Sequence, residues 1–149
     1  MNDRKYVDIQ LLLLFSCTLT ITSQTYSTPK DDYELSEKCG IRAEKWFKGE
    51  FGQNGVVQNT KEGQSITTYE NHYSRNFNKC FIKLTTTFLN YKLKPKTTSR
   101  MVDVFDINDQ HDIGELYITD GLISQCHVAE KSCTTENEYE NLLKPYMTD

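Results

Sequence analysis

The sequence lacks the residue patterns that build the common metal and nucleotide sites. It has no C-x-x-C and no H-x3-H pair, and Cys126 and His127 are neighbours that would point to opposite faces of a strand, which argues against zinc. The glycine-rich stretch 49–63 is predicted to be a loop, and it lacks the G-x4-G-K-[ST] order of a phosphate-binding loop. The acidic stretch that begins at Asp106 lacks the glycine and the glutamate that a calcium-binding loop needs at its sixth and twelfth positions. We therefore expect no cofactor and no metal.

A basic stripe of the kind that binds nucleic acid is also missing. The 17 lysines and arginines are interspersed with 21 aspartates and glutamates, and the net charge is −4. Because the phosphate backbone demands clustered positive charge, nucleic acid is not an expected partner.

Apolar residues are few, and they make up 37% of the chain of 149 residues. Nine tyrosines and seven phenylalanines must supply much of the core. A chain of this length fits one domain, and a thin core of this kind gains from covalent cross-links.

The N-terminal residues resemble a secretory signal. Arg4 and Lys5 precede an apolar run from Ile9 to Ile21, and polar residues follow. The run is shorter than the roughly 18 to 20 residues that span a bilayer. We predict that residues 1–23 direct export to the periplasm or the exterior; the alternative is a buried N-terminal helix or strand.

The fate of Cys17 has two interpretations. The sequence LFSC, which ends at Cys17, resembles the lipidation site of bacterial lipoproteins, although Phe15 stands where such sites prefer a small residue. Cleavage near Ser23 or Ser27 would instead remove Cys17 with the signal. A lipid anchor at Cys17 is the only membrane contact that we expect.

The other four cysteines are Cys39, Cys80, Cys126 and Cys133. In an exported chain they suggest two disulfides, for which three pairings exist. The six residues between Cys126 and Cys133 favour a local bridge across a hairpin, which leaves Cys39 to pair with Cys80. By loop entropy the longer bridge contributes roughly 3 to 4 kcal/mol.

The domain organisation follows from the patterns along the chain. We predict a short linker at 24–32 and a single domain at 33–149. A helix is predicted over 31–49, because apolar residues recur at helical spacing, with a cap at Asp31, Asp32 or Ser36. A second amphipathic helix is predicted near the C-terminus, from the capping box at Thr135 to Pro145.

Between these helices the pattern is that of β-strands. From Ser65 onward the chain is rich in β-branched and aromatic residues. Cys80 should share one face of its strand with Ile82, while Phe81 faces the other side. The expected fold is α+β, with an N-terminal helix, an antiparallel sheet of four to six strands in a meander of hairpins, and a C-terminal helix packed on one face. The expected strands are 65–73, 79–89, 101–107, 113–119, 121–128 and a short strand near Cys133.

The stretch YENHYSRNFNKC, residues 69–80, is the most polar part of this region. We interpret it as the end of one strand, a turn and the start of the next. Its candidate binding residues are His72, Tyr73, Arg75 and Asn76. Alternatively, His72 is a structural side chain that hydrogen-bonds a neighbour.

The basic connection at 90–100 has two interpretations as well. It contains Lys92, Lys94, Lys96 and Arg100. These residues could attract an anionic surface, and the simpler interpretation is a solvated hairpin loop.

The order of these motifs is similar to that of a group of small exported bacterial proteins without an assigned activity. The similarity rests on a helix cysteine, the HY-x4-NKC pattern from His72 to Cys80, the C-x6-C pattern, and the C-terminal EYENLLKPYM. It implies an exported location and this fold, and it implies no catalytic residues.

The function that we expect is non-enzymatic binding of another envelope or secreted protein, because no complete catalytic motif is present. One alternative is a small secreted hydrolase that uses His72 with Glu70 or Asp103. Another is an inhibitor or immunity-type protein that blocks a secreted enzyme.

Overall fold

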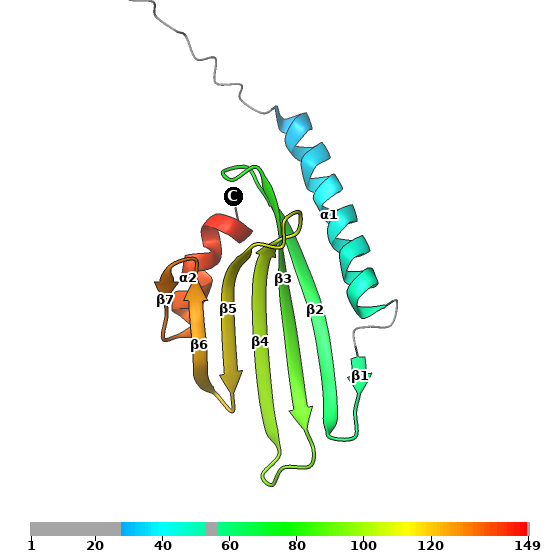
Figure 1. Ribbon diagram of the computed structural model, residues 1–149. Helices are drawn as coiled ribbons and strands as arrows, with labels where there is room; N and C mark the ends of the chain where they lie inside the picture. The colour runs from blue at the N-terminus through cyan, green and yellow to red at the C-terminus, as the bar shows by residue number, and fades with distance from the viewer. Residues whose placement is uncertain (1–27, 53–56, 149) are drawn as a thin grey trace, which may run out of the picture.

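A computed structural model describes residues 28–52 and 57–148. The expected signal segment, with Cys17, lies outside the described residues, as do residues 24–27 of the expected linker. Figure 1 shows an N-terminal helix, a sheet and a C-terminal helix, so the α+β class is confirmed.

Helix α1 spans Pro29–Phe51 and begins two residues earlier than predicted. The Thr28 side chain accepts a hydrogen bond from the backbone N–H of Asp31, and the Asp31 carboxylate accepts one from the backbone N–H of Thr28. This capping box satisfies two N–H groups that a helix start leaves free. The predicted caps were therefore wrong, because Thr28 caps the helix and Pro29 opens it with a backbone angle already suited to a helix.

The sheet has seven strands, and each pairs antiparallel with its neighbour in chain order. This is one strand more than the upper limit that we predicted. The additional strand, β1, lies in the stretch 49–63 that we predicted to be a loop, and all three of its side chains are exposed. The strands are β1 (Val57–Asn59), β2 (Gly63–Ser74), β3 (Lys79–Asn90), β4 (Thr97–Asp106), β5 (Asp112–Thr119), β6 (Leu122–Val128) and β7 (Lys131–Ser132).

The β2–β3 hairpin confirms the interpretation of residues 69–80 as strand, turn and strand. β2 ends at Ser74, and Asn78 closes the turn with a φ of 51°, a left-handed angle that asparagine tolerates. At the far end of the hairpin, a Cβ on Gly63 would lie 2.0 Å from the carbonyl oxygen of Leu89. Only glycine allows the two backbones to approach so closely.

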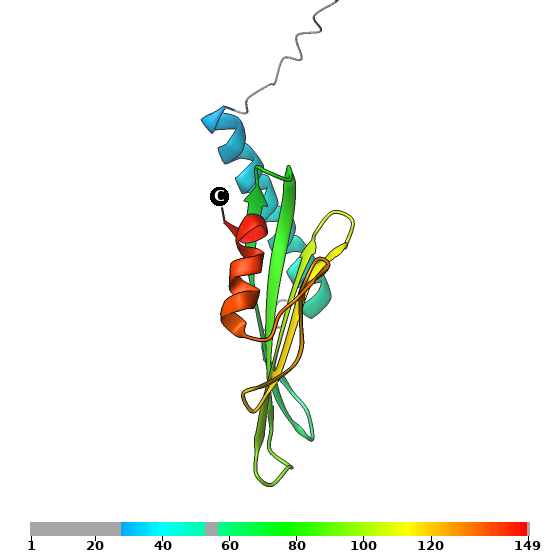
Figure 2. The same cartoon turned by 90° about the vertical axis from the view of Figure 1, so that its left-hand side faces the viewer.

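The core lies on both faces of the sheet. Successive residues of β3 point to opposite faces and therefore belong to two different clusters of buried residues. Ile82 packs toward α1, whereas Phe81 packs toward α2 (Glu136–Met147). Figure 2 shows α2 against one face of the sheet. The residues of the α1 side are Cys39, Ala43, Phe47, Cys80, Ile82, Leu84, Phe105 and Ile107. Those of the α2 side are Phe81, Val102, Val104, Ile113, Leu116, Ile118, Val128, Tyr139 and Leu143.

Both disulfides have the predicted pairing. Cys39–Cys80 joins α1 to β3 with a Cα–Cα distance of 5.4 Å, and Cys126–Cys133 joins β6 to the residue that follows β7 with 5.0 Å. No helix in the part of the chain that the structure describes is long and apolar enough to cross a membrane.

Candidate functional site

A polar recess of about 190 Å³ lies where α1 meets the β2–β3 and β4–β5 turns. Its residues come from α1, from the β2–β3 hairpin and from the β4–β5 turn, which are far apart in the sequence. They are Leu35, Lys38, Cys39, Arg42, Tyr73, Asn78, Cys80 and Asn108.

The Cys39–Cys80 disulfide is part of the wall of this recess. Both cysteines are buried, with exposed fractions of 2% and 4%. Because the bridge joins α1 directly to β3, it fixes the distance between the helix and the start of the strand. The bridge therefore limits how far α1 and β3 can separate at this wall of the recess.

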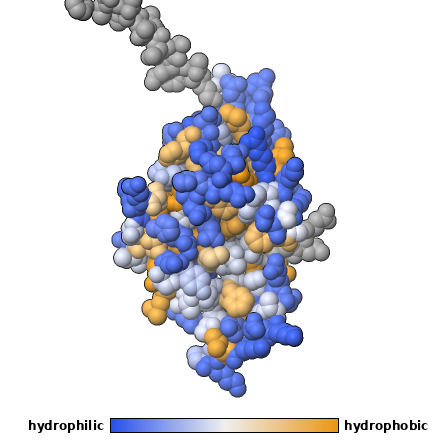
Figure 3. Space-filling view, in the orientation of Figure 1, coloured by the Kyte–Doolittle hydropathy of each residue, from blue (hydrophilic) through white to orange (hydrophobic). Residues whose placement is uncertain are grey.

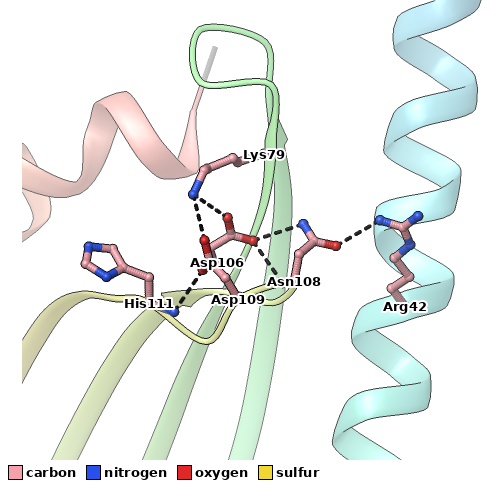
Figure 4. A network of polar contacts seen from close by, with 6 residues as sticks. All are labelled: Arg42, Lys79, Asp106, Asn108, Asp109 and His111. Carbon is pink, nitrogen blue, oxygen red and sulfur yellow. Dashed lines mark hydrogen bonds and ion pairs between the residues drawn. The ribbon is translucent and has the colours of Figure 1, made fainter.

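A buried carboxylate organises the β4–β5 turn beside the recess (Figure 4). Asp106 is 1% exposed, and one of its oxygens accepts hydrogen bonds from the backbone N–H and the side-chain amide of Asn108 at 2.9 and 3.0 Å. The other oxygen lies 2.7 Å from Nζ of Lys79. A buried charge needs such partners, so this ion pair and the two hydrogen bonds hold the turn in one conformation.

Lys79 connects the two turns, since its Nζ also lies 3.1 Å from Asp109. The hydrogen bonds to Asp106 and then to Asp109 raise the pKa of Lys79. The pKa of Asp109 is lowered, first by the backbone N–H of His111 and then by Lys79.

Two cations and several amide and hydroxyl groups face the recess. Nη1 of Arg42 donates a hydrogen bond of 2.9 Å to Oδ1 of Asn108, which leaves the rest of its guanidinium available. The Tyr73 hydroxyl donates to Oδ1 of Asn78 at 2.6 Å. Within residues 28–52 and 57–148, Lys38 has no ion-pair partner. This arrangement can bind an anionic group.

The structure divides the four predicted binding residues among different surfaces. Tyr73 lines the recess, but His72 points to the opposite face of β2, where α2 packs. Arg75 lies in the turn, and its Nε is 3.2 Å from the carboxylate of Asp32 in α1. Asn76 is exposed in the same turn. The four residues therefore do not form one surface.

Successive residues of a strand point to opposite faces of the sheet, and this alternation separates His72 from one of its two candidate acid partners. His72 stands opposite Phe81 on the α2 side, whereas Asp103 stands opposite Leu84 on the α1 side. A hydrogen bond between His72 and Asp103 is excluded, because the sheet lies between them. Glu70 shares the face of His72, two residues earlier in β2.

A second group of titratable residues lies on the α1 side of the sheet. Asp103, Glu115 and His127 stand opposite one another on β4, β5 and β6, beyond the strands β2 and β3 on which α1 packs. Burial, and then the negative charges of Glu115 and Asp112, raise the pKa of Asp103 to about 6. In the described part of the chain, no group of three or more His, Cys, Asp or Glu side chains is arranged to hold a metal ion.

Four polar residues of the recess were missed in the sequence. Lys38 and Arg42 flank Cys39 on α1, and Asn78 is two residues before Cys80, so the predicted disulfide could have indicated that they converge. Asn108 gave no such signal, since it contacts a residue that is 66 positions away in the chain.

Protein-family models, curated proteins and solved structures were all compared with the chain, and none of them matches it. The function is therefore argued from the geometry of the site.

Proposed function

We propose that this chain is an exported, disulfide-bonded protein that binds another envelope or secreted protein without catalysing a reaction. The two disulfides support export, because such bonds persist in oxidising compartments. The charged and then apolar N-terminal residues are of the kind that directs secretion.

The recess is the observation that carries this proposal. Lys38 and Arg42 place two positive charges at its edge, and Asn78 and Asn108 add amide groups. Guanidinium and amide donors together suit a carboxylate. The volume of about 190 Å³ is below the roughly 300 to 1,000 Å³ of sites that enclose small molecules. An acidic side chain or a C-terminal carboxylate of a partner protein fits this space.

Hydrolysis has less support, because the groups that it needs are apart. His72 does not reach the recess, and the described residues that line the recess include no aspartate, glutamate, histidine or serine. An inhibitor or immunity-type role is a special case of protein binding, which would be recognised when the captured partner is an enzyme that loses its activity in the complex.

Site-specific crosslinking in the producing cells tests the proposal. A photoreactive phenylalanine analogue at position 78 should give a defined adduct with one partner. The same group at Gln125, which is exposed on β6, should not give this adduct. Lys38→Glu should abolish the adduct, whereas the matched change Lys45→Glu, on the same helix but outside the recess, should leave it intact. Equal loss with both variants would contradict the proposed site.

Export is tested separately by the mass of the protein recovered from envelope and external fractions. An exported chain should gain about four hydrogen atoms on reduction, two for each disulfide. Its N-terminus should begin at a lipidated Cys17 or after Ser23 or Ser27. An uncleaved chain with free thiols, recovered from the cytoplasm, would contradict export.

A further inference from the structure

Positive charge is concentrated in one segment of the chain. Residues 71–102 contain seven lysines and arginines and no aspartate or glutamate, in a chain whose net charge is −4. This segment forms the end of β2, all of β3 and the first part of β4. Its cations must therefore pair with carboxylates from elsewhere in the protein or remain available for a partner.

Four of the seven cations have carboxylate partners in other elements. The three that remain lie close together, at every second position of one loop. The pairs are Arg75–Asp32, Lys79–Asp106, Lys83–Glu140 and Arg100–Glu136. Within the described residues, Lys92, Lys94 and Lys96 have no ion-pair partner. All three lie in the loop between β3 and β4, residues 91–96, which we call the tip loop.

The tip loop also exposes apolar side chains next to its lysines. Tyr91 is 52% exposed and Leu93 is 51% exposed. Charged and apolar side chains alternate here, so a partner that buries the apolar side chains also contacts the lysines. An alternating set of lysines with an aromatic and an aliphatic residue is suited to the interface of an anionic bilayer, where aromatic rings settle at the headgroups and lysines meet phosphates.

The loop is held in a fixed conformation at one end of the molecule. Oδ1 of Asn90 accepts hydrogen bonds from the backbone N–H groups of Lys92 and Leu93 at 3.0 and 3.3 Å. Nζ of Lys96 lies 5.7 Å from the centre of the Tyr91 ring. Figures 1 and 2 both place this loop at the end of the sheet far from α2, where it projects beyond the other hairpins. In Figure 3 the same end mixes hydrophilic and hydrophobic surface.

We propose that the tip loop docks the protein on an anionic phospholipid surface. Lys92, Lys94 and Lys96 meet the phosphate headgroups, while Tyr91 and Leu93 enter the interface. The recess at the opposite end of the sheet then faces away from the lipid, where a protein partner can reach it. This contact is separate from a lipid anchor, and it does not depend on the proposed partner.

Vesicle binding by the chain, in the form in which its host processes it, tests the proposal. The vesicles contain phosphatidylcholine with or without phosphatidylglycerol. The variant K92Q/K94Q/K96Q should bind anionic vesicles about a hundredfold more weakly than the wild type, since each lysine near such a surface changes the partition about fivefold. The matched control K45Q/K131Q/K144Q changes the net charge equally, and these lysines are exposed outside the tip loop. It should bind like the wild type.

The comparison between these two triple variants isolates the tip loop from any contribution of the N-terminal residues. Equal binding by both would overturn the proposal. Binding of the wild type to phosphatidylcholine alone, with no gain from phosphatidylglycerol, would overturn it as well.

A tryptophan at position 93 reports the contact directly. In Leu93→Trp the emission should shift to shorter wavelength with anionic vesicles and be quenched by brominated lipid chains. Leu93→Ser should weaken binding without changing its salt dependence, because it removes apolar contact and leaves the charges. If position 93 is not quenched, and polyphosphate binds wild type and Leu93→Ser equally tightly, the loop is a site for soluble polyanions and the membrane proposal is wrong.

Discussion

Asp103 should destabilise the folded protein near neutral pH. Its carboxyl group is half-buried on β4, and burial together with Glu115 and Asp112 raises its pKa to about 6. In the unfolded chain the pKa of an aspartate is about 4. Between about pH 4 and pH 6 the folded protein therefore holds a proton that the unfolded chain has lost, so the free energy of unfolding decreases as the pH rises through this window.

The size of this effect follows from the pKa difference. A shift of about two units corresponds to about 3 kcal/mol for a fully buried group. Since Asp103 is in part accessible to water, screening reduces the contribution to about 1 to 2 kcal/mol. Asp103→Asn removes the charge with little change in shape. The variant should be more stable than the wild type by this amount near pH 7, and the difference should vanish below about pH 4, where the carboxyl is protonated in both states.

Urea unfolding with intact disulfides, followed by circular dichroism from acid to neutral pH, measures this difference. Glu115→Gln should reproduce part of the gain, because it removes one of the two charges that repel Asp103. Glu130→Gln, an exposed acid in the β6–β7 turn, controls for the change in net charge and should have almost no effect. A gain in Asp103→Asn that is the same at every pH, or a loss at neutral pH, would refute the reasoning.

Three further predictions concern the core and the cross-links. Replacing both cysteines of the α1–β3 disulfide with serine should cost about 4 kcal/mol, against about 2 kcal/mol for the β6–β7 disulfide, because the sequence separations are 41 and 7; urea midpoints of the two double variants give the order. Asp106→Ala should cost about 3 kcal/mol, since it removes the charged acceptor of two hydrogen bonds, and thermal unfolding measures the loss. Leu143→Ala should cost about 2 to 5 kcal/mol by leaving a cavity under α2, whereas Leu122→Ala, at a side chain that is 76% exposed, should change stability by less than about 0.5 kcal/mol.

The central strands could be predicted because the positions of their apolar residues indicate which residues face each side of the sheet. In β3, Cys80, Ile82 and Leu84 belong to the core cluster on the α1 side, whereas Phe81 belongs to the cluster on the α2 side. The pairing of the cysteines followed from their spacing, since Cys126 and Cys133 are close enough in the chain to close a hairpin. The short hairpin connections fixed the antiparallel order.

The parts that were missed depend on contacts rather than on local pattern. The residues of β1 are all exposed, so no alternation distinguishes them from a loop, and they are extended because β2 offers them an edge. The start of α1 was missed for a different reason. Thr28, Pro29 and Asp31 form a helix-start signal that the sequence does contain, but the surrounding polar composition suggested a linker.

The four predicted binding residues do not share one surface, because successive residues of a strand point to opposite sides of a sheet. His72 and Tyr73 are adjacent in the sequence, yet one packs on the α2 side and the other lines the recess. Alternation could have separated them before the structure was known. The recess itself was not predictable in this way, since Arg42 and Asn108 meet only after α1 has docked on the sheet.

The acid-free segment 71–102 links the folding of this protein to its proposed contact with lipid. Its four paired cations lie in the β2–β3 turn, β3 and β4, and their carboxylate partners lie in α1, in α2 and at the end of β4. Arg100–Glu136, whose two side chains are both exposed, contributes little stability, typically less than about 1 kcal/mol. The other three pairs each have one largely buried partner, and opposite charges favour each helix on its own face. If segment 71–102 contained aspartates or glutamates of its own, they would compete with the carboxylates of the helices for these cations. The three lysines of the tip loop have no such role in folding within the described residues, so their charge is free to act on a surface outside the protein.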